Sequence, residues 1–172
     1  MRGLLPHVRR VMVRINFRRG FIMRRLILTC VLLASPTFAQ AQTSQTCAPV
    51  TEQQVKGLFD RWNASLKTLK ADEVLKNYAP DAILLPTVSN QPRLTQAERL
   101  DYFVHFLESK PQGVIDQRVI RLGCNDAIDS GLYTFTMGDG KKVRARYSFA
   151  YSYQNGQWLI VSHHSSAMPE KE

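Results

Sequence analysis

Two arginines near the C-terminus have a spacing that could hold an anion. Arg144 and Arg146 alternate with apolar and aromatic residues in the run Lys141–Tyr153. Because successive side chains of a strand point to opposite faces, both guanidinium groups would project from one face. Two such groups together bind a carboxylate through paired hydrogen bonds. The pair predicts a cationic wall in a ligand pocket, and the alternative is a solvated strand face.

Two adjacent histidines lie in the last apolar run, Gln157–Met168. Neighbouring residues of a regular strand face opposite sides, so His163 and His164 cannot both bind one metal ion. The sequence places no cysteine or acidic cluster with metal-ligand spacing beside them, and we predict neither a metal site nor a cofactor. His164 has the same parity as Trp158 and Ile160. We therefore expect His164 to face the pocket and His163 to face solvent or a subunit interface.

Other candidates for chemistry lie on the expected helices. Asp101 and His105 are four residues apart and could pair, but they lie off the apolar stripe, which favours a surface pair over a catalytic dyad. Trp62 and Tyr78 are candidate ligand contacts, with a place in the core as the alternative. The sequence contains no nucleotide-binding loop and no nucleophile elbow. His164 is thus the one candidate for a general base.

The elements that would position these residues are helices first and strands afterwards. Thr51 and Thr95 each stand three residues before a Gln or Glu, the spacing of a capping box that starts a helix. A shorter helix is expected between Asp72 and Pro80. On the helix from Thr95, the inward positions are expected to be Leu100, Phe103, Val104 and Leu107.

Strand-like runs fill the rest of the chain, and Asn155-Gly156 predicts a tight hairpin between the last two. Helices followed by an antiparallel meander predict an α+β domain, with three N-terminal helices packed on a curved, mainly antiparallel sheet. The expected strands are Asp81–Pro86, Val114–Cys124, Ala127–Met137, Lys141–Tyr153 and Gln157–Met168.

The positive charge of the chain belongs to its N-terminal extension. Eight of the 23 Lys and Arg residues precede residue 42, and none of the 14 Asp and Glu residues does. The remainder carries 23 − 8 = 15 cations against 14 acids, a net charge of 15 − 14 = +1. A nearly neutral domain has no electrostatic basis for binding nucleic acid.

The extension has the three parts of an export signal. These are the charged start Met23-Arg24-Arg25, the apolar core Leu26–Ala34 and the small-residue cleavage site Ala39-Gln40-Ala41. The apolar core is shorter than the ~18 residues that span a bilayer. Residues 1–22 are either an over-called start or a charged leader. We predict that residues 1–41 are removed, and that the mature protein is periplasmic or secreted and not held in a membrane.

Two cysteines would remain after cleavage, Cys47 and Cys124. In an exported protein such a pair is more often a disulfide than a site. The bridge would tie the N-terminal tail to the sheet, and the alternative is two free, buried thiols.

The closing segment, Gly156-Gln157-Trp158 through Val161 and His163-His164-Ser165 to Pro169, resembles the last strand of the calcium/calmodulin-dependent protein kinase II association domain. It is most similar to the stand-alone bacterial members of that family, within the nuclear-transport-factor-2-like (polyketide-cyclase-like) superfamily. The resemblance covers roughly residues 50–169. It implies a cone-shaped single domain over residues 51–169 with a pocket at its wide end, between tails 42–50 and 170–172. It implies assembly and not kinase activity.

Three functions fit these observations. The preferred one is an exported homodimer without catalytic activity that binds a small anionic molecule in the cone, because both faces of the last strand are apolar and a second copy would cover the outer face. The first alternative is an isomerase, dehydratase or cyclase with His164 as its base. The second is a module that assembles with another exported protein.

Overall fold

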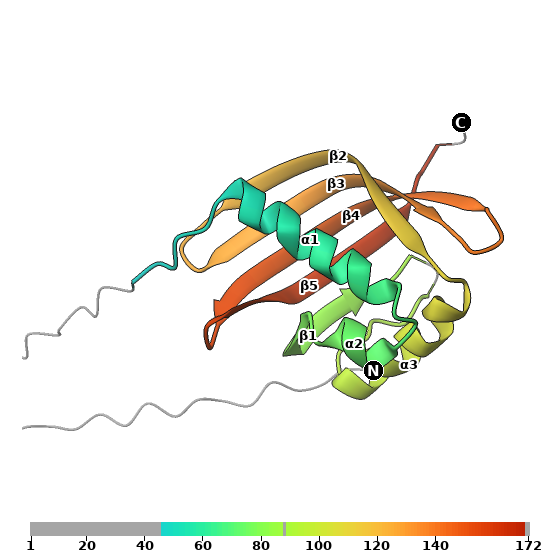
Figure 1. Ribbon diagram of the computed structural model, residues 1–172, viewed down its shortest axis with the longest axis horizontal. Coiled ribbons are helices and arrows are strands. Elements are labelled where there is room, and N and C mark those ends of the chain that lie inside the picture. Colours follow the sequence, from blue (N-terminus) through green and yellow to red (C-terminus); the bar gives the residue numbers. More distant parts are fainter. Residues whose placement is uncertain (1–45, 88, 171–172) are drawn as a thin grey trace, which may run out of the picture. The chain divides into compact units, whose positions relative to one another are not determined.

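The computed structural model describes residues 46–87 and 89–170 (Figure 1). The residues interpreted as an export signal lie outside these ranges. The described residues form three helices and five strands. The helices are α1 (Glu52–Leu66), α2 (Ala71–Leu75) and α3 (Gln96–Glu108), and the strands are β1 (Tyr78–Leu85), β2 (Gln112–Leu122), β3 (Asp126–Thr136), β4 (Lys142–Gln154) and β5 (Gln157–Ala167).

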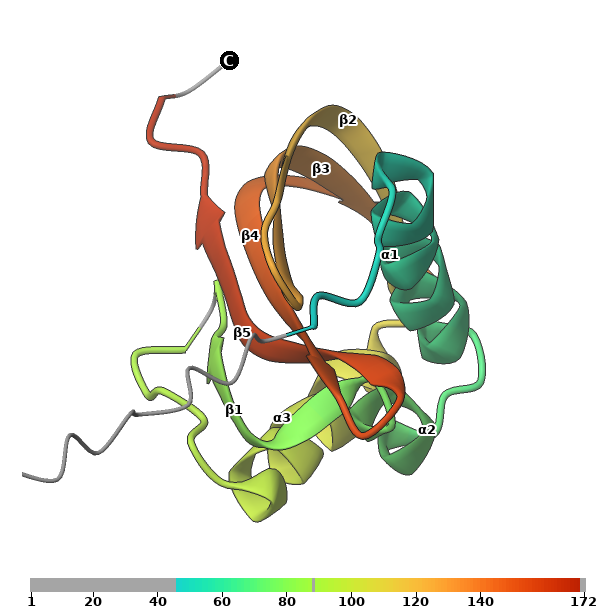
Figure 2. The same ribbon diagram turned by 90° about the vertical axis from the view of Figure 1, so that its left-hand side faces the viewer.

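The strands form one curved sheet in the order β1-β5-β4-β3-β2. β1 runs parallel to β5, and the other neighbours are antiparallel. Figure 2 shows α1 lying across the concave side of the sheet. The α+β class and the curved, mainly antiparallel sheet predicted from the sequence are confirmed.

Both predicted capping boxes are present. The Thr51 hydroxyl accepts a hydrogen bond from the amide of Gln54 at 3.2 Å, and the Gln54 side chain accepts one from the amide of Thr51 at 2.8 Å. Thr95 and Glu98 make the same reciprocal pair at the start of α3. These bonds satisfy amides that have no partner within the helix, so the sequence alone fixes where α1 and α3 begin.

The short helix differs from the prediction. α2 begins after Lys70 and not at Asp72, and it ends at Leu75, where the Asn77 side chain donates to the carbonyl of Val74. β1 therefore starts before Pro80 and contains it. A proline, which lacks an amide hydrogen, is tolerated here because β1 is an edge strand.

The buried face of α3 also differs from the prediction. Phe103 and Leu107 point inward as expected, but Leu100 and Val104 are 40% and 50% exposed. Their place in the interior is taken by Arg99, which is 1% exposed. The face is therefore set by a buried cation that an apolar pattern cannot reveal.

One extra residue in β5 changes which side chains face inward. Ile160 pairs with Tyr151 and Ser162 pairs with Ala150, so Val161 has no counterpart on β4. Such a bulge reverses the alternation of side chains beyond it. His163, and not His164, therefore shares the inner face with Ile160.

The predicted disulfide between Cys47 and Cys124 is present. It joins the segment before α1 to the turn between β2 and β3. The bridge closes a sequence separation of 77 residues. In the chain-entropy description, a loop of this length adds about 4 kcal/mol to the free energy of unfolding. Within the ranges that the structure describes, no helix is long and apolar enough to cross a membrane.

Candidate functional site

A cavity of about 970 Å³ lies between α3 and the inner face of the sheet. Its buried end is largely aromatic and carries a few polar groups. The buried side chains that line it are Trp62, Leu84, Phe103, Tyr133, Phe135, Ala145, His163 and Ser165. A small molecule in this end would contact apolar walls on most sides and a few directed hydrogen-bonding groups.

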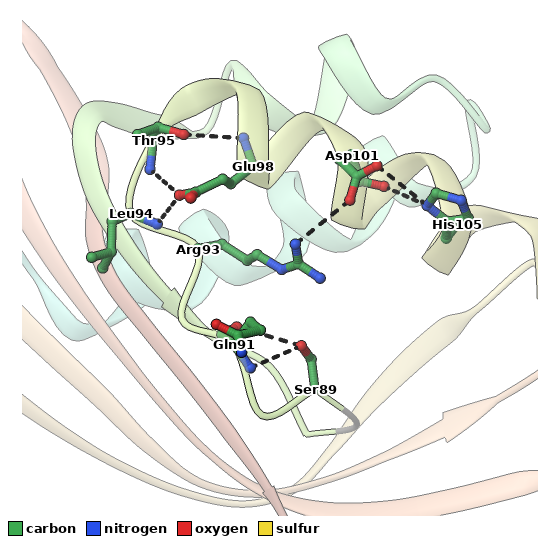
Figure 3. A network of polar contacts seen from close by, with 8 residues as sticks. All are labelled: Ser89, Gln91, Arg93, Leu94, Thr95, Glu98, Asp101 and His105. Atoms are coloured by element: carbon green, nitrogen blue, oxygen red, sulfur yellow. Dashed lines mark hydrogen bonds and ion pairs between the residues drawn. The ribbon is translucent and has the colours of Figure 1, made fainter.

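Charged side chains lie at the mouth of the cavity, where Figure 3 shows a chain of polar contacts. Arg93 Nη1 is 3.5 Å from Asp101 Oδ2, and His105 Nδ1 is 2.8 Å from the carbonyl oxygen of Asp101. The side chains of Asp101 and His105 are 59% and 68% exposed, so they form the surface pair that the sequence favours. Glu98 accepts hydrogen bonds from the amides just before α3 and fixes the start of the helix that carries this pair.

A relay of hydrogen bonds orients His163. Trp62 Nε1 donates to the hydroxyl of Tyr78 at 3.0 Å, and that hydroxyl lies 2.8 Å from His163 Nδ1. If the Tyr78 hydroxyl accepts from Trp62 and donates to Nδ1, both its hydrogen and Nδ1 have partners. On this ground we assign the ring hydrogen of His163 to Nε2. The Nε2 atom is buried and has no hydrogen-bond partner among the described residues.

His163 is uncharged at neutral pH. Burial, with a smaller contribution from the neighbouring His164, lowers the pKa of His163 to about 3. Its ring stacks on Phe149 with 4.1 Å between centroids. The imidazole is therefore a fixed, neutral hydrogen-bond donor, and it is too weak a base to hold a proton at pH 7.

Three hydroxyl groups meet beside this imidazole. Tyr133 donates to Ser165 Oγ at 2.6 Å, and Ser165 Oγ is also hydrogen-bonded to Thr87 Oγ1. Burial raises the pKa of Tyr133, which keeps its hydroxyl protonated. Ser165 is two residues after His163 on β5, so both side chains point to the inner face.

His164 lies on the other side of β5, and the prediction that it faces the cavity is wrong because of the bulge at Val161. It lines a second, smaller pocket of about 280 Å³. Thr87 and Ser165 line this second pocket as well as the cavity.

The two predicted arginines do not line the cavity. Val143 and Ala145 of β4 face it, so Arg144 and Arg146, which alternate with them, project from the outer face of the sheet. Arg146 Nε donates there to Ser166 Oγ at 3.2 Å. Their predicted place in the pocket wall is wrong, because the register of β4 turns its apolar side chains toward α1.

Trp62 lines the cavity. Tyr78 does not line it but contacts residues that do, through its hydrogen bond to His163 and its ring contact with Phe103. The sequence-based reasoning missed Thr87, Tyr133, His163 and Ser165. The spacing of His163 and Ser165 was visible in the sequence, but their direction depended on the bulge. The part of the chain that the structure describes contains no group of three or more His, Cys, Asp or Glu residues placed to hold a metal ion.

Comparison with known proteins places this geometry in a family. The model of the calcium/calmodulin-dependent protein kinase II association domain matches residues 51–169. A structure of this type from Xanthomonas campestris is 48% identical, with a TM-score of 0.68, over 72% of this chain and 91% of that chain. A comparison with curated proteins found no match.

More distant structures share the fold. An NTF2-like protein of unknown function from Pseudomonas putida KT2440 is 17% identical, with a TM-score of 0.63, over 73% of this chain and 92% of that one. A cyanobacterial iota-carbonic anhydrase complexed with bicarbonate is 21% identical, with a TM-score of 0.65, over 71% and 94%. Together with the sequence motif at residues 156–169, these matches show that the chain belongs to the calcium/calmodulin-dependent protein kinase II association domain family, on an NTF2-like fold.

Proposed function

We propose that this protein binds bicarbonate at the buried end of its cavity and interconverts it with carbon dioxide. The observation that carries the proposal is the Nε2–H group of His163, a buried donor without a partner among the described residues, in a cavity wall that also holds the Ser165 hydroxyl. A buried donor that lacks an acceptor costs about 1–3 kcal/mol. An oxygen of a bound ligand would recover that free energy.

The polar groups of the buried end match a small oxyanion. The imidazole N–H can only donate, whereas the hydroxyls of Ser165 and Thr87 can donate or accept. Bicarbonate has acceptor oxygens and one O–H donor, so it can use both kinds of group. The charges at the cavity mouth include both signs, and binding therefore depends on these directed hydrogen bonds more than on net charge.

The same end of the cavity suits carbon dioxide. Trp62, Phe103 and Phe135 form apolar walls that favour a small molecule without charge. In the hydration reaction, the oxygen of a water bonds to the carbon and one proton leaves. The His163 N–H would donate to the oxygen that gains negative charge, and the hydroxyl of Ser165 would position the water. The bicarbonate complex of the structurally similar carbonic anhydrase makes bicarbonate the first ligand to test.

The isomerase, dehydratase or cyclase alternative has less support. His164, its expected base, does not line the cavity. His163 does, but an imidazole with a pKa of about 3 is a weak base for removing a proton from carbon. The carboxylates that line the cavity, Asp101, Glu108 and Asp139, are exposed at its mouth.

The test combines binding and turnover. The mature protein is titrated with sodium bicarbonate, sodium acetate and sodium chloride while the imidazole resonances are followed by NMR, and carbon dioxide hydration is measured by stopped flow. We expect bicarbonate to shift the His163 Nε2–H signal and chloride to leave it unchanged. Ser165→Ala should lower kcat/KM by about 10²-fold or more, because it removes a hydroxyl that positions the reacting water. Ser162→Ala, on the same strand but lining neither pocket, is the matched control.

Each other result selects a different function. Binding of bicarbonate or acetate without hydration of carbon dioxide would favour the non-catalytic binding protein, which is the function that the sequence prefers. The absence of both binding and hydration in a folded protein would overturn the proposal and favour the assembly module.

We also propose that the protein is exported and self-associates. The Cys47–Cys124 bridge fits an oxidising compartment. Val114, Val119 and Ile128 are exposed and alternate with inward-facing residues, so they share the outer face of β2 and β3. An apolar sheet face of this kind is a typical surface for a second copy, and the family is one of association domains.

A further inference from the structure

The hydroxyls of Thr87 and Ser165 stand between two pockets. Both residues line the large cavity, and both line the second pocket on the other side of β5. Their oxygens are hydrogen-bonded to each other. Pro86 and Ser89 line both pockets as well, and Thr87 and Ser165 are the shared hydroxyls that are in contact with each other.

The second pocket is lined by one histidine, His164. It is the one titratable side chain among the described residues that line this pocket. On the same face of the sheet, Arg146 is hydrogen-bonded to Ser166, two residues after His164.

The hydrogen bonds of the hydroxyl pair are compatible with proton transfer out of the cavity. Tyr133 donates to Ser165 and occupies one of its lone pairs, and either hydroxyl of the Ser165–Thr87 pair can be the donor; in the orientation that carries a proton outward, the hydrogen of Ser165 is directed to Thr87. The second lone pair of Ser165 remains for a donor in the cavity, and the hydrogen of Thr87 remains for an acceptor in the second pocket. That pocket, at about 280 Å³, has room for water between Thr87 and His164.

We propose that Ser165 and Thr87 pass the proton released by carbon dioxide hydration through the wall of the cavity to His164, which delivers it to solvent. The proposal rests on the proposed function. As the water oxygen bonds to carbon, its proton goes to Ser165 Oγ, the Ser165 proton goes to Thr87 Oγ1, and the Thr87 proton goes through water to the imidazole of His164. His164 then gives its proton to buffer. Each hydroxyl already holds the hydrogen that it received, and both rotate back to their starting orientation before the next turnover. Bicarbonate dehydration runs the same transfers in reverse.

The chain contains a matched comparison for this route. His105 is the other exposed histidine of the described residues, and it lies at the open mouth of the cavity beside Asp101. A proton that left through the mouth would pass His105, whereas a proton that left through the hydroxyl pair would pass His164. Substituting each histidine separately therefore distinguishes the two routes.

The experiment measures carbon dioxide hydration by His164→Ala, His105→Ala and Thr87→Val at low buffer concentration and with added imidazole. His164→Ala should lower kcat about tenfold or more and leave kcat/KM unchanged, because proton export follows formation of bicarbonate. Imidazole should restore its kcat. Thr87→Val interrupts the route inside the wall, so its lower kcat should not recover with imidazole. His105→Ala should match the unsubstituted protein.

Three results would overturn the relay. The first is a His164→Ala variant with unchanged kcat. The second is a lower kcat in His105→Ala and not in His164→Ala. The third is full activity in Thr87→Val. In each case the unsubstituted protein is active, so the proposed function survives and the route alone fails. An unsubstituted protein without hydration activity removes the proposed function and the relay with it.

Discussion

The chemistry of the cavity depends on the state of one buried imidazole. The hydroxyl of Tyr78 occupies His163 Nδ1, and stacking on Phe149 fixes the plane of the ring. Burial makes the protonated form unfavourable, so the group donates from Nε2 and carries no charge. Because this imidazole does not change its charge near pH 7, it can donate to an oxyanion in the same way across the neutral pH range.

The pKa of His163 predicts how stability depends on pH. In the unfolded chain the imidazole has an ordinary pKa near 6.5, and in the folded protein its pKa is lowered to about 3. Between these values the unfolded chain binds the extra proton, so His163 makes the fold less stable as pH falls below 6.5. We expect a loss of about 2 kcal/mol between pH 8 and pH 5 from this group. Urea unfolding at both pH values measures it.

The control for this prediction is His163→Phe, which keeps an aromatic ring and cannot titrate. Its unfolding free energy should lack that loss, whatever its absolute stability. Burial raises the pKa of Asp129, which acts in the opposite direction and equally in both proteins, so the difference between them isolates His163. Equal pH dependence in the two proteins would contradict a buried, neutral His163.

Among the elements, α3 supports an irregular stretch of β1. The pairing of β1 with β5 is regular at Tyr78 and again from Ile83, but its register shifts between them. In that interval the guanidinium of Arg99 donates to the carbonyls of Ala79, Pro80 and Ala82. A side chain of α3 thus supplies hydrogen bonds that the strand ladder does not, and it fixes the strand that leads to Thr87.

Arg99→Met should therefore destabilise the protein by about 2–4 kcal/mol, because it leaves buried carbonyls without donors while keeping the length of the side chain. Arg121→Met on β2, at an exposed position, is the matched control and should change stability by less than about 0.5 kcal/mol. Thermal unfolding of both variants checks the prediction. A loss of similar size in the two variants would show that Arg99 contributes only as a surface cation does.

The same elements show what the sequence could predict. Thr51 and Thr95 start their helices through bonds to residues three positions away, so local spacing was enough. The inward turn of His163 depends on a bulge opposite β4, and the burial of Arg99 depends on carbonyls of β1. Both result from contacts distant in sequence. The fold class and the disulfide were therefore predictable, whereas the direction of the site residues was not.

At the scale of the whole molecule, the two faces of the sheet differ in what they contact. Its inner face carries the aromatic core and the cavity, and its outer face exposes Val119 and Ile128 on β2 and β3. His164 lies on β5, and β4 and β3 separate it from β2. Two copies could therefore pack through β2 and β3 while the second pocket stays open to solvent.

Native mass spectrometry of the protein expressed with its full N-terminal extension and purified without reductant tests export, bridging and self-association together. We expect a dimer whose chains start near Gln42 and are lighter by two hydrogens than the reduced form, because Cys47 and Cys124 are bonded. Val119→Asp should shift the dimer to monomer, since a buried carboxylate without a partner opposes association. Val104→Asp, at an exposed position on α3 away from this face, is the matched control and should leave the protein dimeric. A monomeric unsubstituted protein would contradict the role of the outer face, and a chain that retains residues 1–41 would contradict export. A protein that is exported and dimeric, yet reduced, would contradict a Cys47–Cys124 bridge in the mature protein.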